Sequence, residues 1–393
     1  MIHSKLEWCD LQATVGLGCF SPADGHAAEC HAMIKINAPF ATANEQYFLL
    51  EKAVQRLMQL PELQNNTLVR KVFFVSDAIN QAPFLKPSAN EAVSIVQQPP
   101  LNGSKASLWL YFVENVEVIH EEDGTVLMQR PDYAHLFNTQ LHERSITEGN
   151  SPLMPLPIAI EYQTKQIFER YLQTLARHNC TLANNCIRTW IYVQDVDVQY
   201  AGMVTARRNY FEKEGLTPQT HYIASTGIEG RYVYPDVLML MDAYAVKGIK
   251  NVQIKHLQAL THLNPTYEYG VTFERGTAIE YGDRCHIFIS GTASIDNRGE
   301  IVHPMDIEKQ TARTFENVQA LLAEANAKMP DVASMIVYLR DTADTAIVER
   351  YLEVNYPTIP YVMVLAPVCR PGWLIEVECI AIKSVNNKSY ASF

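Results

Sequence analysis

Residues 368–382 read VCRPGWLIEVECIAI, and the surrounding segment, residues 268–386, is best interpreted around this stretch. An Arg-Pro-Gly turn precedes an apolar run from Trp373 to Ile382, which is typical of a buried strand. Glu376 and Glu378 interrupt this run, and because strand side chains alternate between faces, the two carboxylates share one face. A carboxylate in an apolar strand is costly unless it is paired, protonated or placed in a polar pocket. This strand is therefore the first candidate for chemistry.

The composition predicts a soluble globular protein of more than one ordinary domain. The chain has 393 residues, of which 48% are hydrophobic and 19% are charged. A net charge of −11 without a basic block predicts no nucleic-acid partner. The N-terminus lacks a signal-peptide layout, and no apolar run approaches the roughly 18 residues that span a bilayer, so we expect a cytoplasmic protein without a membrane segment. The eight cysteines are scattered singly, which is typical of reduced cysteines and not of a disulfide framework.

Three stretches of the chain repeat one pattern, a helix followed by a strand that ends aromatic-x-x-Asp. Helical spacing of apolar residues occurs at 43–60, 160–178 and 309–326, and the strands follow at 69–77, 187–195 and 333–341. A second segment comes next, clearly helical only in the later copies (200–214 and 343–354). Each copy closes with an apolar strand, at 106–118, 237–246 and 374–382.

This repetition predicts an α+β fold of tandem units, each reading strand-strand-helix-strand-helix-strand-strand. We expect units at 1–120, 121–250 and 251–393, with mixed sheets, helices packed outside, and an intramolecular pseudo-trimer within a monomer. The stretches 78–105 and 247–268, rich in Pro, Asn and Gln, are expected to be loops. The alternative is that helix-then-strand patterns recur by chance, as they do in many α+β proteins.

The third unit carries several short motifs that are specific in combination. They are RGTA (275–278), GDR (282–284), SGTASI (290–295), VYLR (337–340) and Cys369-Arg370 followed by Glu376. The second unit adds WIY (190–192), ASTGIEG (224–230) and Ala243-Tyr244. Together these residues resemble the Rid/YjgF superfamily, whose fold is chorismate-mutase-like, and within it the chorismatases. The resemblance spans about 186–386 and implies that residues 1–120 form a degenerate unit.

The chain departs from the chorismatase pattern at a few positions, none of which removes the proposed acid. Met305 stands where the family has Gly, Gly372 where it has Asp, and Trp190-Ile191-Tyr192 where it has WNY. The arginine with which Rid deaminases hold a substrate carboxylate falls at Tyr361. That difference disfavours imine deamination.

The resemblance implies removal of the enolpyruvyl group of chorismate, with release of pyruvate and no metal or organic cofactor. Glu376 matches the family's acid, which protonates the enol ether and makes an oxocarbenium-like centre open to attack. A carboxyl whose pKa is raised by burial can do this near neutral pH. The alternative is a buried Glu376 that is paired with a core arginine. Glu378 is interpreted as structural or supporting.

Two positions bear on the product. Hydrolytic chorismatases have Ala at the positions of Cys369 and Gly276, whereas the branch that forms 3-hydroxybenzoate has Cys and Gly. Gly276 is expected to leave room beside the ring, and Cys369 to steer attack by the substrate's own hydroxyl. The 4-hydroxy isomer, a hydrolytic dihydroxycyclohexadiene carboxylate, and a purely packing role for Cys369 stay open.

Chorismate has two carboxylates, which arginine binds bidentately. Arg275, Arg340 and Arg370 are the candidates for this contact. Superfamily sites lie between neighbouring subunits, so the second unit is expected to supply hydrogen bonds to the ligand. The residues concerned are Thr226, Gly227 and Tyr244.

Two other functional classes remain, a Rid-like enamine or imine deaminase and a non-catalytic small-molecule-binding protein. His26, Cys30 and His31 are metal-binding residue types, but without a fourth ligand in a loop-like region they predict no metal site.

Overall fold

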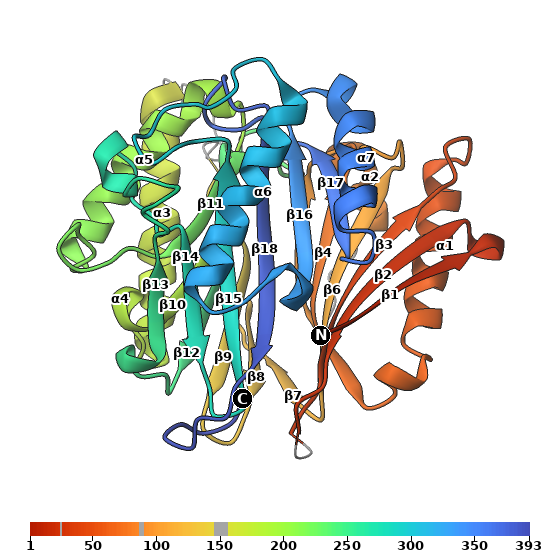
Figure 1. The fold of residues 1–393 in the computed structure, drawn as a ribbon, viewed down its shortest axis with the longest axis horizontal. Coiled ribbons are helices and arrows are strands. Elements are labelled where there is room, and N and C mark those ends of the chain that lie inside the picture. The colour runs from red at the N-terminus through yellow and green to blue at the C-terminus, as the bar shows by residue number, and fades with distance from the viewer. Residues whose placement is uncertain (24–25, 86–89, 145–155) are drawn as a thin grey trace.

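The computed structural model describes residues 1–23, 26–85, 90–144 and 156–393, and arranges them as three six-stranded mixed sheets with helices on their outer faces (Figure 1). Each sheet is formed by one continuous part of the chain. Within every sheet the strands follow the same order, first-second-third-sixth-fourth-fifth in sequence. Three copies of one unit therefore build the molecule.

The first sheet has the order β1-β2-β3-β6-β4-β5, and only β4 and β5 run parallel. Its elements are β1 (Ile2–Trp8), β2 (Ala13–Phe20), β3 (Glu29–Ile36), α1 (Ala43–Leu57), β4 (Asn66–Val75), α2 (Ala78–Gln81), β5 (Ala92–Gln97) and β6 (Ala106–Glu114).

The second sheet has the order β11-β10-β12-β9-β8-β7. Its elements are β7 (Glu117–His120), β8 (Thr125–Gln129), β9 (Ala134–His142), α3 (Leu156–Arg177), α4 (Leu182–Asn185), β10 (Cys186–Val193), α5 (Val196–Lys213), β11 (Ala224–Glu229) and β12 (Met239–Lys247).

The third sheet has the order β13-β14-β15-β18-β16-β17. Its elements are β13 (Ile254–Leu257), β14 (Gly276–Glu280), β15 (Arg284–Ala293), α6 (Ile307–Glu324), β16 (Val332–Leu339), α7 (Thr345–Asn355), β17 (Tyr361–Leu365) and β18 (Ile375–Ser384).

Local signals fix where the long helices begin. Thr42 caps α1 in a capping box with Glu45, and the Asp306 carboxylate caps α6 by accepting a hydrogen bond from the Lys309 backbone N–H at 3.0 Å. The helix α6 then buries one apolar stripe on its own sheet, which includes Phe315, Val318 and Leu322.

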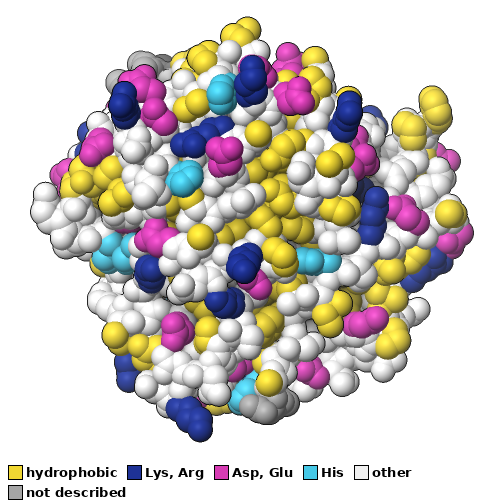
Figure 2. All heavy atoms as spheres, viewed as in Figure 1, with side chains coloured by type: hydrophobic (Ala, Val, Ile, Leu, Met, Phe, Trp, Pro, Cys, Tyr) yellow, Lys and Arg dark blue, Asp and Glu magenta, His cyan; other side chains and the backbone are white. Residues whose placement is uncertain are grey.

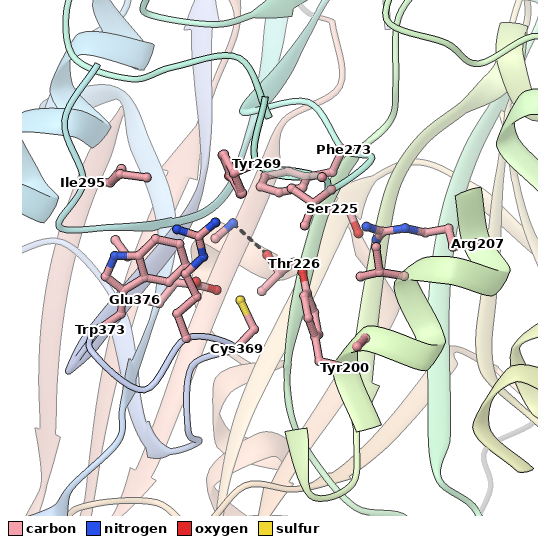
Figure 3. Close-up of a pocket in the computed structure, with 18 of the residues that line it drawn as sticks. Tyr200, Arg207, Ser225, Thr226, Tyr269, Phe273, Ile295, Cys369, Trp373 and Glu376 are labelled. Atoms are coloured by element: carbon pink, nitrogen blue, oxygen red, sulfur yellow. Dashed lines mark hydrogen bonds between the residues drawn. The ribbon is translucent and has the colours of Figure 1, made fainter. Parts of the chain in front are cut away.

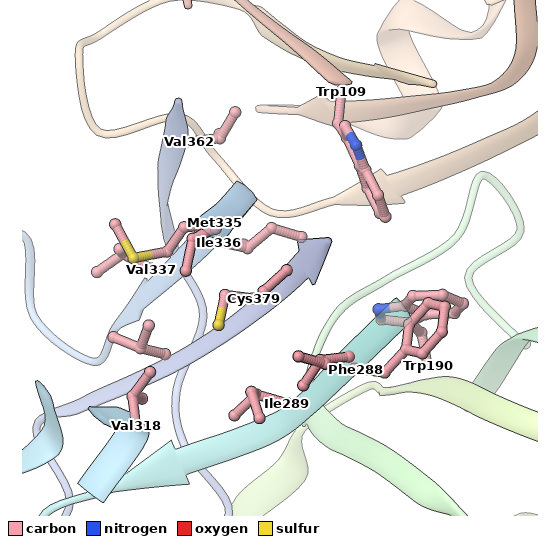
Figure 4. Packing of buried hydrophobic residues seen from close by; sticks show 14 of the residues in the cluster. Trp109, Trp190, Phe288, Ile289, Val318, Met335, Ile336, Val337, Val362 and Cys379 are labelled. Atoms are coloured by element: carbon pink, nitrogen blue, oxygen red, sulfur yellow. The ribbon is translucent and has the colours of Figure 1, made fainter. Parts of the chain in front are cut away.

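The inner faces of the three sheets meet in a shared core. Figure 4 shows Trp109 of the first unit, Trp190 of the second and Phe288 of the third in this core. Buried ion pairs add to the apolar contacts: Arg70 of β4 pairs with Asp242 of β12 at 2.8 Å, and Arg188 of β10 with Glu378 of β18 at 2.7 Å. Each ion pair crosses from one unit to the next, so the units are joined by buried contacts.

The structure confirms the predicted α+β pseudo-trimer and its main helices and strands, with three corrections. Every unit begins with three strands. The stretch 78–105 contains β5, whose AVSIVQ sequence does carry an apolar strand signal, and 247–268 contains β13, whose four residues are too few to show a pattern. The second sheet already begins with Glu117, ahead of residue 121.

One cysteine pair differs from expectation. Cys19 and Cys30 lie directly opposite one another on β2 and β3 and form a disulfide, so the prediction that all cysteines are reduced is wrong for this pair. Cross-strand register brings the two together, and their spacing in the sequence does not reveal it.

Two properties of the structure concern membranes and the charge of the surface. In the described part of the chain no helix is both long and apolar enough to cross a membrane. On the face seen in Figure 2, basic and acidic side chains are interspersed.

Candidate active site

A cavity of about 340 Å³ lies between the second and third units. The second unit contributes α5 and β11 (Figure 3). The third unit contributes strand β15, the loop that precedes β14, and the turn that leads into β18. The residues around it include Tyr200, Ala201, Val204, Thr205, Arg207, Arg208, Ser225, Thr226, Gly227, Tyr269, Gly270, Val271, Phe273, Arg275, Gly291, Ala293, Ile295, Cys369, Arg370, Trp373 and Glu376.

Within the part of the chain that the structure describes, Glu376 is the only carboxylate that lines this cavity, and it is 5% exposed. In the described part of the chain nothing donates a hydrogen bond to its carboxyl group. Burial, reinforced by the charge of Glu378, raises the pKa of Glu376 to about 8, although Arg188 and Arg275 oppose the shift. The carboxyl group is therefore protonated at neutral pH and faces the cavity.

Glu378 shares the strand face, as predicted, but is fully engaged in the protein. Its carboxylate accepts hydrogen bonds from Arg188 Nη2 and Trp190 Nε1, both at 2.7 Å, and from the Thr226 hydroxyl. The two acids thus have separate environments: Glu378 forms a buried ion pair, and Glu376 is a neutral acid without a hydrogen-bond donor among the described residues.

Thr226 joins the two units behind the acid. Its Oγ1 accepts hydrogen bonds from Arg188 Nη2 at 2.5 Å and from the Gly291 backbone N–H at 2.9 Å (Figure 3). The Gly291 N–H is free to do so because β15 shifts register between Ile289 and Thr292. Such irregularities are common beside active sites, where they redirect strand groups.

Gly291 also makes room for the acid. A Cβ atom at this position would lie 2.1 Å from Glu376 Oε1, so any side chain there would displace the carboxyl group.

Four arginines line the cavity: Arg207, Arg208, Arg275 and Arg370. None of them forms an ion pair with a carboxylate within the described residues. Arg275 is oriented by Asn264, whose backbone O and side-chain Oδ1 each accept a hydrogen bond from Arg275 Nη2 at 3.1 Å. Buried Arg207 donates through Nε to Thr272, and its Nη2 has no hydrogen-bond partner among the residues that the structure describes. The cavity is therefore strongly cationic and suited to an anion.

Cys369 lies between the acid and the second unit. Burial and the neighbouring Glu376 raise the pKa of Cys369 to about 12, so it is a neutral thiol. The Tyr200 ring approaches Gly227 across the cavity wall, where an added Cβ would lie 2.9 Å from Tyr200 Cε2.

The structure brings six of the nine predicted site residues to this cavity: Glu376, Cys369, Arg275, Arg370, Thr226 and Gly227. The other three lie outside the lining of this cavity. Tyr244 lines a separate internal cavity of about 30 Å³ and lies 2.7 Å from His135 Nδ1. Arg340 pairs with Asp197 at 2.5 Å. Gly276 packs on its neighbours, where an added Cβ would lie 3.0 Å from the Phe288 carbonyl oxygen.

Several lining residues were missed in the sequence, namely Tyr200, Arg207, Arg208, Tyr269, Phe273 and Trp373. Arg207 had a readable signal, because it follows Met203 by four residues and precedes Phe211 by four, on the buried face of a helix. The loop residues Tyr269 and Phe273 show no comparable pattern.

Strand register identifies the counterparts of Glu376 in the other units. Tyr338 pairs with Glu376, Tyr192 pairs with Leu240, and Phe74 pairs with Ser107. At this position only the third unit has an acid.

The metal-type residues near the N-terminus have other partners. His31 Nδ1 accepts a hydrogen bond from Trp109 Nε1 at 3.0 Å, and Cys30 is in the disulfide.

The fold and site together define a chain of three Rid/YjgF-like units with a cationic cavity between the second and third. The family model described as Endoribonuclease L-PSP matches residues 277–383. A RutC family protein of Pyrococcus abyssi is 38% identical over 109 residues, covering 27% of this chain and 84% of the relative. The chain belongs to the RutC family.

Two further comparisons concern activity and fold. The 3-aminoacrylate deaminase RutC of Acinetobacter baylyi is 30% identical over 97 residues, covering 24% of this chain and 77% of that protein. A crystal structure of a chorismatase superposes with a TM-score of 0.63 at 17% identity, covering 82% of this chain and 96% of that one. At this identity the likeness shows a shared fold.

Proposed function

We propose that this chain cleaves the enolpyruvyl ether of chorismate and releases pyruvate. The observation that carries the proposal is a protonated Glu376 in a cavity lined by four arginines, where neither the acid nor the arginines form an ion pair within the described residues. A carboxylic acid that is neutral at pH 7 donates a proton, and fixed guanidinium groups bind a substrate that has two carboxylates. The chorismatase-like fold and the sequence motifs of the third unit support the same substrate.

The four arginines that line the cavity come from both of the units that form it. Figure 3 shows Glu376 and Trp373 on one side of the cavity and Arg207 on the other. Arg275 and Arg370 belong to the third unit, as Glu376 does, whereas Arg207 and Arg208 belong to the second. In this proposal one carboxylate binds each pair, and the ether lies between them beside the acid.

In the proposed reaction Glu376 protonates the methylene carbon of the enolpyruvyl group. The resulting oxocarbenium-like centre forms beside the newly charged Glu376 carboxylate, which stabilises it. Attack at that centre and cleavage of the ether then release pyruvate. With the substrate's own hydroxyl as nucleophile a cyclic ketal forms; the Glu376 carboxylate then takes the proton from the ether-bearing ring carbon while the ring C–O bond of the former hydroxyl breaks. The ring becomes aromatic, and collapse of the remaining hemiketal releases pyruvate and 3-hydroxybenzoate, so the atoms balance without water. With water as nucleophile, the hemiketal collapses directly and the second product is a dihydroxycyclohexadiene carboxylate.

We propose 3-hydroxybenzoate as the second product. The support is Cys369, which lines the cavity next to Glu376 as a neutral thiol and matches the hydroxybenzoate-forming branch. Gly276 gives no independent support, because it lies outside the cavity lining.

The test is to incubate purified protein with chorismate and to quantify pyruvate and aromatic acids by chromatography. Glu376→Gln is expected to lower kcat by about 10²- to 10⁴-fold, because the amide has no acidic proton. Glu349→Gln, which changes an exposed carboxylate on α7, is the matched control and should keep normal turnover. Because the reactive form is protonated, kcat/KM should be level below pH 8 and fall above it.

The outcomes separate the alternatives. Formation of pyruvate with a non-aromatic diol would support chorismate as the substrate but reject 3-hydroxybenzoate as the product. The similarity to a 3-aminoacrylate deaminase favours a second candidate, imine or enamine hydrolysis. Ammonia release from such a substrate, with no pyruvate from chorismate, would replace the proposal.

A further inference from the structure

One wall of the cavity is a row of alternating aromatic and cationic side chains: Phe273, Arg275, Tyr269, Arg370 and Trp373. The Arg275 guanidinium carbon lies 5.6 Å from the Phe273 ring centroid and 5.3 Å from that of Tyr269. The Arg370 guanidinium carbon lies 4.4 Å from the Tyr269 centroid and 4.9 Å from that of Trp373. Tyr269 therefore contacts both arginines.

The two arginines are held in different ways. Asn264 accepts hydrogen bonds from Arg275 Nε and Nη2, so polar contacts already orient that guanidinium group. Arg370 has no hydrogen-bond or ion-pair partner for its side chain within the described residues. Its orientation thus depends on the Tyr269 and Trp373 rings, and its N–H groups stay available to a ligand.

The loop that holds Tyr269 is itself fixed. Thr266 Oγ1 donates to the Phe273 carbonyl oxygen at 2.6 Å and closes the base of the loop. Arg208 of α5 donates to the Gly270 carbonyl oxygen, which ties the loop to the second unit. Gly270 has φ 84, a conformation that favours glycine and sets the turn directly after Tyr269. The ring is held from both sides of the cavity.

A guanidinium group that lies over aromatic rings directs its N–H groups away from them, in its own plane. A carboxylate that pairs bidentately with it must lie in that plane as well. If the carboxylate is conjugated to a ring, the ring continues the same plane. A tetrahedral oxyanion has no such planar continuation.

We infer that Tyr269 is a specificity-determining residue that holds Arg370 for carboxylates attached to flat, unsaturated rings. The inference rests on the proposed function for its biological substrate, since one chorismate carboxylate is attached to an unsaturated ring. It predicts that the site prefers ring carboxylates to tetrahedral anions of similar or greater charge.

Equilibrium binding measurements test this inference without requiring catalytic turnover. Isothermal titration with benzoate and with inorganic phosphate is compared for the unmodified chain and for Tyr269→Leu, Tyr269→Phe and Arg370→Lys. Tyr267→Leu, at an exposed tyrosine of the same loop, is the matched control. Benzoate should bind at least about tenfold more tightly than phosphate. Tyr269→Leu and Arg370→Lys should each weaken benzoate by about 5- to 20-fold, and Tyr269→Phe and Tyr267→Leu by less than about twofold.

Phosphate binding as tight as benzoate, or no benzoate binding, would overturn the inference. So would a Tyr269→Leu variant that binds benzoate normally. If that variant does not fold, Tyr269→Phe and Arg370→Lys still test the inference, because only Arg370→Lys should weaken benzoate binding. Benzoate binding that follows this pattern without any chorismate turnover would reject the proposed function and leave the specificity of the site standing.

Discussion

Glu376 and Glu378 show how two identical residues on one strand face acquire different chemistry. Glu378 accepts three hydrogen bonds, one of them from Arg188, with which it forms a buried ion pair. Glu376 has no donor in the described part of the chain and lies beside a negative neighbour, so its neutral form is favoured. The strand pattern places both acids on one face, but only the tertiary structure shows that their surroundings differ.

The proton on Glu376 makes the free energy of unfolding depend on pH. The folded-state pKa is about 8, whereas an unfolded glutamate has the ordinary value of 4.5. Between these values the folded state holds a proton that the unfolded state releases, so stability falls as pH rises from about 4.5 to 8. Glu376→Gln removes this penalty. We expect its Tm to exceed that of the unmodified chain by a few degrees at pH 8, with a smaller difference at pH 5, in thermal unfolding followed by circular dichroism. A Tm difference independent of pH would contradict the assignment.

At the scale of elements, β15 and β18 build the site through one irregularity and one glycine. The register shift in β15 releases the Gly291 N–H toward Thr226, and the absence of a side chain at Gly291 leaves space for the Glu376 carboxyl group.

Gly291→Ala should therefore reduce activity more than stability. Its Cβ would lie 2.1 Å from Glu376 Oε1 and force the acid out of position, and a displacement of about 1 Å can cost on the order of 10²-fold in rate. We expect kcat for pyruvate release to fall by about 10- to 100-fold, with Tm changed by only a few degrees. Normal kcat in a folded Gly291→Ala protein would show that the Glu376 carboxyl group can move without loss of activity, and would contradict this prediction.

Gly276→Ala tests the opposite behaviour on the neighbouring strand β14. The new Cβ would meet the Phe288 carbonyl oxygen at 3.0 Å and the Leu257 side chain at 3.1 Å, away from the cavity lining. We expect a loss of about 1 kcal/mol in urea unfolding and an unchanged ratio of aromatic to non-aromatic product. A shift toward the diol would restore Gly276 to a role in product choice.

At the scale of the whole molecule, three related interfaces have diverged. At the interface of the second and third units Glu376 faces an open cationic cavity, whereas its counterparts Leu240 and Ser107 cannot donate a proton as a carboxylic acid does. Where the third unit meets the first, Lys35 lies over the Tyr361 ring at 3.5 Å. The units without the acid are thus suited to a supporting role.

That support is expected to depend on the buried ion pair between Arg70 and Asp242. Both side chains are nearly inaccessible, and Arg70 also lies 4.1 Å over the Trp190 ring. Arg70→Ala would leave an unpaired buried carboxylate and should cost about 3–5 kcal/mol in urea unfolding. The control is Arg56→Ala, which breaks an exposed pair with Asp10 and should cost at most about 1 kcal/mol. Equal losses in the two variants would mean that the buried pair does not hold the units together.

The sequence by itself determined the repeated α+β unit, the long helices and central strands, and the strand that carries Glu376. These features depend on local periodicity, which a single chain displays directly. Strand β13 was missed because its four residues are too few to show a pattern, whereas the apolar β5 was missed because the residues around it are rich in Pro, Asn and Gln. The Cys19–Cys30 pair was missed because register alone brings it together.

Only the tertiary structure decided which residues share the cavity. Arg340 and Tyr244 occupy motif positions, yet one pairs with Asp197 and the other lines a separate internal cavity. Arg207 and Tyr269 have no motif and line the site. The physical reason is that the cavity forms where two units separated in sequence pack together. Side-chain direction, proton occupancy and the absence of a partner at such an interface depend on both units at once.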